Sequence, residues 1–295
     1  MQITAGGKKY ELSNEILINR ETRESYFTLA RETFGLDFNK WYESGFWGGS
    51  FVPYVIFDGK RAVSSAAACV QETYRRGEKK ICVQLSTVMT SPEYRRLGLN
   101  RLLIEKILSD LENKCDVIFL FGNDSVADYY PKFGFERFTE YEFNVPVTRN
   151  PGKKRKMDLK DKAEVRLLLD KYAGANPFAE YRVNDPGTFM FHCLTFYPDD
   201  VYYFEKFGAA VIVKYDKNKM TVAEILAPPR FSLREILSAL ADGETETAYL
   251  GFTPPPSYEN FAKESEEGDN HPFVLSKKEN IFKGEKIKVP LTSRA

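Results

Sequence analysis

Residues 88–100 read Val-Met-Thr-Ser-Pro-Glu-Tyr-Arg-Arg-Leu-Gly-Leu-Asn and join an apolar, strand-like run to the start of a helix. Leucine and isoleucine residues spaced in fours predict that helix over 99–111. The loop before it presents backbone N–H groups at the positive end of the helix dipole, which suits a pyrophosphate. Gly98 lets the backbone approach phosphates closely, and Arg95 and Arg96 add positive charge. An ordinary strand–helix connection would explain the loop equally well.

A second pattern follows in residues 117–135. Residues 117–121 are all apolar and predict a strand at the centre of a sheet. Asn123 comes directly after this strand, Tyr130 comes seven residues later, and Gly134-Phe135 forms a turn. We expect a helix over 126–132 and a strand over 136–144.

The surrounding sequence predicts a mixture of helices and strands. In the first half, we expect a helix over 15–34 and strands over 54–57, 62–73 and 80–89, with a hairpin turn at Asp58-Gly59. In the second half, we expect helices over 159–172 and 231–240 and strands over 200–207, 209–214, 219–225, 247–252 and 273–275. Residues 150–157 are rich in lysine and arginine and predict a linker. Residues 203–208 imitate the region around Tyr130, but no arginine-rich glycine loop precedes them, so we expect a hairpin there.

Composition excludes several classes of protein. The 295 residues are 43% hydrophobic and 28% charged, which is normal for a folded protein, and the length predicts two domains. Forty-two basic residues balance 42 acidic ones, which argues against a nucleic-acid partner. Four cysteines without a Cys-x-x-Cys pair and two histidines predict no metal site. No apolar run suits a membrane helix or a signal peptide, so we expect a cytoplasmic protein with no membrane partner.

The two patterns together resemble the GCN5-related N-acetyltransferase (GNAT) family, and most closely a bacterial two-domain group within it. The cofactor loop of the family reads Arg/Gln-x-x-Gly-x-Gly/Ala, and residues 95–100 follow it except at Asn100. The resemblance implies an α+β GNAT fold over 1–148, with a mixed, mostly antiparallel sheet flanked by helices. It implies a linker over 149–157 and a second α+β domain over 158–295. That second domain is expected to be a degenerate GNAT-like copy without its own cofactor site.

The resemblance also implies a reaction. The cofactor would be acetyl-CoA, and its acetyl group would pass to a primary amine of a small molecule or peptide by direct attack in a ternary complex. Tyr130 would be the general acid, since a phenol with a pKa near ~10 is protonated at neutral pH yet can donate its proton. The backbone of Val88 or Met89 would stabilise the oxyanion and contact the thioester. The residues expected to bind the cofactor are Val88, Met89, Thr90, Arg95, Arg96, Leu97, Gly98, Leu99, Asn100, Asn123 and Tyr130.

Several assignments stay open at this stage. Tyr129 is the alternative to Tyr130, and Asn123 is either a cofactor contact or a residue that caps its loop. The aromatic stretch 41–47 either lines the acceptor pocket or packs in the core. The chain is alternatively a non-catalytic acyl-CoA-binding or regulatory module, or a structural interaction protein with Pro-rich and acidic loops. The oligomeric state is not fixed, and the general base is not identified. Glu43 and Glu72 are candidates by location, since the strand over 81–89 offers Gln84 and Thr87 but no carboxylate. A water molecule or the carboxylate of Ala295 is the alternative.

Overall fold

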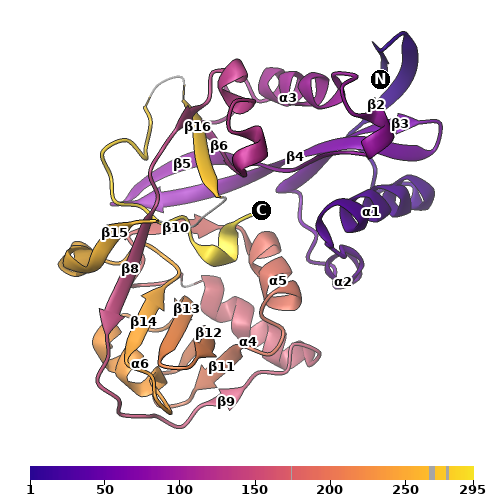
Figure 1. The fold of residues 1–295 in the computed structure, drawn as a ribbon. Helices are drawn as coiled ribbons and strands as arrows, with labels where there is room; N and C mark the ends of the chain where they lie inside the picture. The colour runs from indigo at the N-terminus through magenta and orange to yellow at the C-terminus, as the bar shows by residue number, and fades with distance from the viewer. Residues whose placement is uncertain (174, 266–269, 277–278) are drawn as a thin grey trace.

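The computed structural model describes residues 1–173, 175–265, 270–276 and 279–295, and it contains two sheets that are each flanked by helices (Figure 1). Among these residues, the first sheet has nine strands: β1 (Gln2–Ala5), β2 (Lys8–Ser13), β3 (Phe51–Asp58), β4 (Arg61–Arg75), β5 (Glu78–Thr90), β6 (Val117–Gly122), β16 (His271–Ser276) and β7 (Glu136–Arg137) in spatial order, with β10 (Tyr181–Asn184) beside β4. Most neighbours are antiparallel, but β5 and β6 run parallel. The first sheet is therefore mixed and mostly antiparallel, as expected.

The second sheet is smaller and lies beside the first (Figure 1). Among the described residues it has seven strands, in the spatial order β15 (Ala262–Glu264), β8 (Tyr141–Pro146), β14 (Thr247–Leu250), β13 (Lys219–Leu226), β12 (Ala209–Asp216), β11 (Val201–Phe204) and β9 (Arg155–Lys156). The α-helices of the two units are α1 (Arg20–Phe34), α2 (Asn39–Glu43), α3 (Leu99–Asp110), α4 (Lys162–Ala173), α5 (Pro186–Thr195) and α6 (Leu233–Leu240). The α+β class is confirmed.

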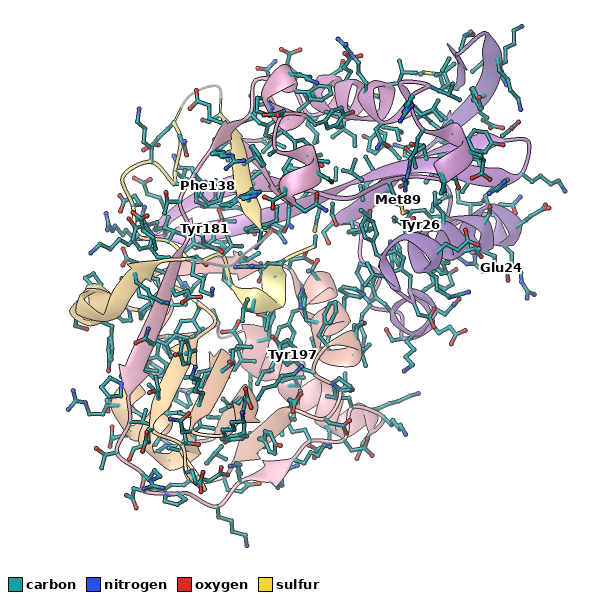
Figure 2. The ribbon with its side chains drawn as sticks, in the orientation of Figure 1. Glu24, Tyr26, Met89, Phe138, Tyr181 and Tyr197 are labelled. Atoms are coloured by element: carbon teal, nitrogen blue, oxygen red, sulfur yellow. The ribbon has the colours of Figure 1, made fainter. Side chains whose placement is uncertain are left out.

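Helices cover both faces of the first sheet because its strands are apolar on both sides. Successive residues of β3 illustrate this: Ile56 packs in the cluster with α3, and Val55 packs in the cluster with α1. Side chains of a strand alternate between its faces, so one buried run supplies two separate cores. Figure 2 shows Tyr26 of α1 and Met89 of β5, which belong to the same cluster on the α1 side.

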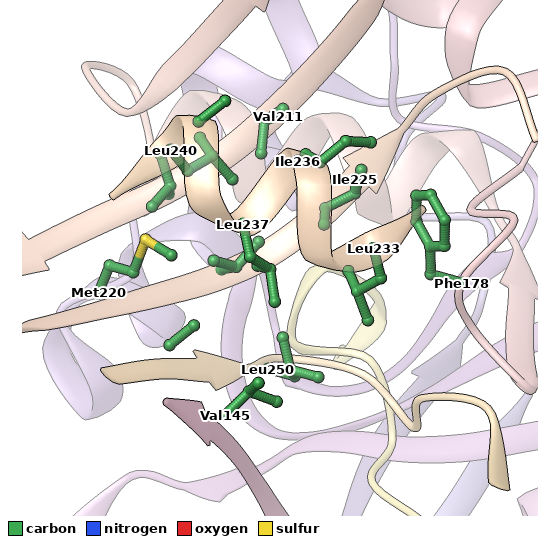
Figure 3. Packing of buried hydrophobic residues seen from close by; sticks show 14 of the residues in the cluster. Val145, Phe178, Val211, Met220, Ile225, Leu233, Ile236, Leu237, Leu240 and Leu250 are labelled. Atoms are coloured by element: carbon green, nitrogen blue, oxygen red, sulfur yellow. The ribbon is translucent and has the colours of Figure 1, made fainter. Parts of the chain in front are cut away.

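The two units share a strand–helix sequence. In the first, the β4–β5 hairpin is followed by α3 and then by β6 parallel to β5. In the second, the β12–β13 hairpin is followed by α6 and then by β14 parallel to β13. A right-handed crossover helix is the usual way to join parallel neighbours. Leu233, Ile236 and Leu237 of α6 pack onto this second sheet (Figure 3).

The units exchange strands across the expected linker. β8 precedes residue 149, yet it pairs with β14 in the second sheet, and its Val145 packs in the core under α6 (Figure 3). In return, β16 of the second half pairs with β6 and β7, and its Phe273 packs in the core under α3. β9, within the expected linker, pairs with β11. The division into 1–148 and 158–295 stays a prediction about folding units, and the sheets themselves interleave.

Two expected elements are wrong in detail. Residues 126–132 do not form an α-helix, and two 3-10 turns, Asp124–Val126 and Tyr130–Phe133, take its place. Pro131 explains this, because it has no N–H to donate and its ring would clash with the preceding turn of an α-helix. The expected strand over 136–144 divides into β7 and β8, which belong to different sheets. Part of the expected acidic loop, residues 266–269, lies outside the described residues.

The last residues of the chain connect the two units. β13 continues to Leu226, but its pairing with β14 ends at Val222. The second sheet therefore opens between β13 and β14 beyond this point. The segment 290–295 occupies this opening: Leu291 N donates to Gly251 O at 2.8 Å, and Thr292 Oγ1 donates to the buried carboxylate of Glu224 at 2.9 Å. No helix among the described residues is both long and apolar enough to cross a membrane.

Candidate functional site

The candidate site begins where β5 and β6 separate. Their parallel pairing ends at Gln84 and Phe119, although β5 continues to Thr90 and β6 to Gly122. The register between β4 and β5 also shifts at this level, and Thr87 has a positive φ of 45°. A bulge of this kind bends a strand away from its neighbour. The resulting wedge opens into a cavity of about 1290 Å³ that both strand ends line.

The loop before α3 forms one end of the cavity. Gly98 precedes the helix with φ 80°, in the left-handed region that glycine tolerates, and a Cβ there would meet no atom within 4 Å. Gly98 has no side chain to cap the first turn of α3, and Gly98, Leu99 and Asn100 line the cavity, so the backbone N–H groups of the helix N-terminus lie beside it. Arg95, Arg96, Arg101 and Lys132 also line this cavity. Donors, dipole and cations together suit a pyrophosphate.

Asn100 has a structural role that explains its departure from the family pattern. Its Oδ1 accepts hydrogen bonds from Ser64 Oγ of β4 and Thr90 Oγ1 at the end of β5, both at 2.8 Å. Glycine or alanine could not make these bonds. Asn100 thus ties the first turn of α3 to the separated end of β5 and fixes the loop relative to the wedge.

Tyr130 lies on the other side of the wedge. Gly122 permits its approach, since a Cβ on Gly122 would lie 3.2 Å from the Tyr130 ring and 3.0 Å from Val126. Tyr130 is 5% exposed and packs against Phe273 of the exchanged strand β16. Burial raises its pKa above the ordinary value of 10, so it is protonated at neutral pH. Tyr129 also lines the cavity and is half buried, and burial raises its pKa too.

The other expected cofactor residues divide by position. Asn123 lines the cavity, and its Oδ1 accepts a hydrogen bond from Ser125 Oγ at 2.6 Å, so it also stabilises its own loop. Leu97 turns away from the cavity and packs toward Gly6 in the β1–β2 turn. The cavity brings together the remaining members of the set, which are Val88, Met89, Thr90, Arg95, Arg96, Gly98, Leu99 and Asn100.

Two of the acidic residues considered as bases lie elsewhere. Glu43 is exposed on α2 and does not line the cavity. Glu72 lies near the β10 end of β4, where Lys79 and Tyr74 bind its carboxylate. Gln84 and Thr87 do line the cavity. Gln84 holds Ala295 through two hydrogen bonds of 2.9 Å, one from Ala295 N and one to Ala295 O.

The second half contributes a wall that the sequence did not predict. Helix α5 was not expected, yet Thr188, Phe191 and His192 line the cavity, together with Phe196 just after the helix and Arg294. Trp41 Nε1 donates to Gly187 O at 3.0 Å and fastens α2 to α5. The available signal was Asp185 as an N-cap before Pro186, followed by an apolar run. No local pattern could bring this helix to a site most of whose other residues lie far earlier in the chain.

His192 provides a test of the wall through pH. Its Nε2 donates to Arg294 O at 2.5 Å, and burial lowers its pKa from 6.5 to about 4. The His192 imidazole binds a proton near pH 6.5 in the unfolded chain but only near pH 4 in the folded protein. The stabilisation that neutral His192 contributes is therefore fully present above pH 6.5 and is lost as the pH falls toward 4. The difference corresponds to roughly 3 kcal/mol. Between about pH 7 and 4, urea unfolding should show a loss larger by about that amount in the wild type than in His192→Gln. Equal losses would contradict the assignment.

Among the described residues, no group of three histidine, cysteine, aspartate or glutamate side chains is arranged to hold a metal ion, and no disulfide joins the four cysteines. The arrangement can instead hold an anionic ligand against the α3 loop, with a buried tyrosine hydroxyl at the wedge.

Comparisons with known proteins agree with this geometry. The family model described as an acetyltransferase (GNAT) domain matches residues 21–138. No curated protein matches the chain. Among solved structures, Eis1 from Mycobacterium abscessus is 15% identical over 90% of this chain and 73% of its own, with a TM-score of 0.57. GCN5-related N-acetyltransferases from Kribbella flavida (15% identity, 90% and 72% covered, TM-score 0.55) and Anabaena variabilis (12%, 90% and 72%, 0.55) are similar in fold.

Proposed function

We propose that this chain, whose residues 21–138 match the model of an acetyltransferase (GNAT) domain, is an N-acetyltransferase that moves an acetyl group from acetyl-CoA to a primary amine of a small molecule or peptide. One observation carries the proposal. The cavity joins the α3 loop on one face of the first sheet to an aromatic region on the other face, and it passes through the wedge beside Tyr130. An acetyl donor and an amine can therefore meet at the wedge from opposite faces.

The chain's own groups fit an acetyl donor of this kind. The N-terminus of α3 and the nearby arginines would bind the pyrophosphate. The stretch of β5 that no longer pairs with β6 would present backbone groups of Val88 and Met89 along the extended arm of acetyl-CoA and at its thioester oxygen. When bound, acetyl-CoA supplies an acetyl group that is already activated as a thioester.

Proton transfers complete the reaction. The amine nitrogen forms a bond to the acetyl carbon, the carbon–sulfur bond breaks, and the departing sulfur takes the hydroxyl proton of Tyr130. The amine must lose a proton to a second group. A water molecule in this cavity, beside the polar side chains of Gln84 and Thr87, is the group that we assign to take that proton to solvent.

The first test of the proposal is ligand binding. A ligand at a hundred times its dissociation constant should stabilise the fold by about 2.7 kcal/mol. We expect acetyl-CoA to raise the melting temperature where adenosine diphosphate and NAD have little effect. Release of CoA thiol in the presence of an amine should follow. Binding without any thiol release would support a non-catalytic acyl-CoA-binding module instead.

Gly98 offers a matched pair of variants for the phosphate site. Gly98→Glu and Gly98→Gln strain the same positive φ equally, and both place a side chain in open space. Only the glutamate carries a negative charge toward the phosphates. We expect Gly98→Glu to weaken acetyl-CoA binding by about tenfold or more beyond Gly98→Gln, measured by calorimetry. Equal affinities in the two variants would place the pyrophosphate elsewhere.

A further inference from the structure

The acceptor side of the cavity has a uniform chemical character. We define the aromatic wall as the lining residues Phe34, Phe38, Trp41, Phe51, Phe191 and Phe196. The five rings other than Phe34 form a continuous set: Trp41 lies 4.9 Å from Phe191 between centroids and 5.4 Å from Phe51, and Phe191 lies 5.8 Å from Phe38 and 5.6 Å from Phe196. The wall joins α1 and α2 of the first unit to α5 of the second.

Two members of the wall remain exposed at the cavity mouth. Phe34, at the end of α1, is 49% exposed, and Phe196, just after α5, is 42% exposed. In the described part of the chain, four large hydrophobic side chains are exposed, and two of the four line this one cavity. A ligand with an apolar body would remove both from water, which favours binding.

The charged side chains around the cavity disfavour acceptors with several ammonium groups. No aspartate or glutamate side chain belongs to the described residues that line it, and its charged side chains are arginine and lysine. Near the aromatic wall, Arg294 has its charge balanced by Glu140 at 2.6 Å and lies over the ring of Phe121. An acceptor with several ammonium groups would have to leave water without an anionic partner for its additional charges, which is costly.

These observations rest on the proposed function and narrow it to a class of substrate. We propose that the acceptor is a primary monoamine with an aromatic body, an arylalkylamine, whose ring lies on the aromatic wall while its single amine reaches the wedge. Polyamines and other multiply charged amines are poor acceptors because the cavity lacks carboxylate side chains to receive their additional ammonium groups.

Two readouts test this with the full-length protein. Thiol release from acetyl-CoA measures turnover of phenethylamine, hexylamine and hexamethylenediamine, of which the last two share a carbon chain and differ by one amine. Tryptophan fluorescence measures binding in the presence of CoA, since the chain has two tryptophans, Trp41 in the wall and Trp47 at 4.3 Å from it. We expect kcat/KM for phenethylamine to exceed that for hexamethylenediamine by about tenfold or more, with hexylamine between them.

A charge variant tests the wall itself. Phe196→Asp places a carboxylate at the mouth, so kcat/KM for phenethylamine should fall and that for hexamethylenediamine should rise. The matched control is Ile18→Asp, because Ile18 is 82% exposed and lies outside the cavity, and it should change neither value. Preference for the diamine, or no saturable fluorescence change with phenethylamine, would overturn the inference and leave the proposed function intact. Binding of phenethylamine without thiol release from any amine would instead overturn the proposed function, and the acceptor assignment with it.

Discussion

Replacing Tyr130 by Phe is expected to lower kcat for acetyl transfer by about 100-fold or more, since general acid catalysis contributes about 10²–10⁴ to rate. The change removes one hydroxyl from a residue whose ring is buried against Phe273, so the packing of β16 on β6 is retained. The affinity for acetyl-CoA should change little, because we expect the loop before α3 to make the main contacts. Stopped thiol-release assays with saturating amine give kcat, and calorimetry gives the affinity.

Tyr129→Phe is the matched control for this prediction. Tyr129 neighbours Tyr130, lines the same cavity and makes an edge contact with its ring at 5.5 Å. If Tyr130 is the acid, Tyr129→Phe keeps most of the activity. A large loss in Tyr129→Phe with activity preserved in Tyr130→Phe would reverse the assignment. If Tyr130→Phe lowers kcat and kcat/KM by the same factor, the lost interaction is one made in the transition state and not in the ground state.

Replacing Glu140 by Ala is expected to cost about 3–5 kcal/mol of unfolding free energy, the range for breaking a buried ion pair. Glu140 is 4% exposed and receives hydrogen bonds from Arg294 Nη2 at 2.6 Å and from Val289 N at 2.8 Å. Its removal leaves a guanidinium and a backbone donor without this partner in a buried place. Urea denaturation at neutral pH measures the loss.

An exposed pair provides the control. Glu205 is 75% exposed and binds Arg155 at 3.3 Å, so Glu205→Ala should cost less than about 1 kcal/mol. A comparable cost for the two variants would show that the Glu140 pair is not structurally important. Glu140→Ala should also impair acetyl transfer, because Arg294 precedes the residue that Gln84 holds in the cavity.

The sequence predicted the first unit well because its signals are local. The helix spacing over 99–111, the hairpin turn at Asp58-Gly59 and the apolar run before Asn123 each lie within a few residues, and the structure has a helix, a hairpin and a strand there. The α3 loop and Tyr130 likewise meet in one cavity, as the two patterns together suggested. The role of Asn100 of α3 was not predictable, since its partner Ser64 lies 36 residues away in strand β4.

The acceptor side was not predictable for the same physical reason. Phe191, His192 and Arg294 reach the cavity through strand exchange and through a helix whose position depends on Trp41 and Gly187. Gln84 and Ala295 are 211 residues apart. Period and spacing describe neighbours along the chain, whereas these contacts depend on how two sheets interleave.

The exchange of β8 and β16 has a consequence for how the protein is made on the ribosome. β16 leaves the ribosome long after β6 and β7, so the growing chain carries β6 with one open edge, and Phe119 still lacks Val274 and Phe282 of its buried cluster. Open hydrophobic edges are the points at which unfinished chains aggregate, and pairing across long sequence separations is slow. Phe273 of β16 packs against Tyr130, so the surroundings of Tyr130 are complete only when synthesis is nearly over. We therefore expect acetyl transfer only after β16 has been synthesised.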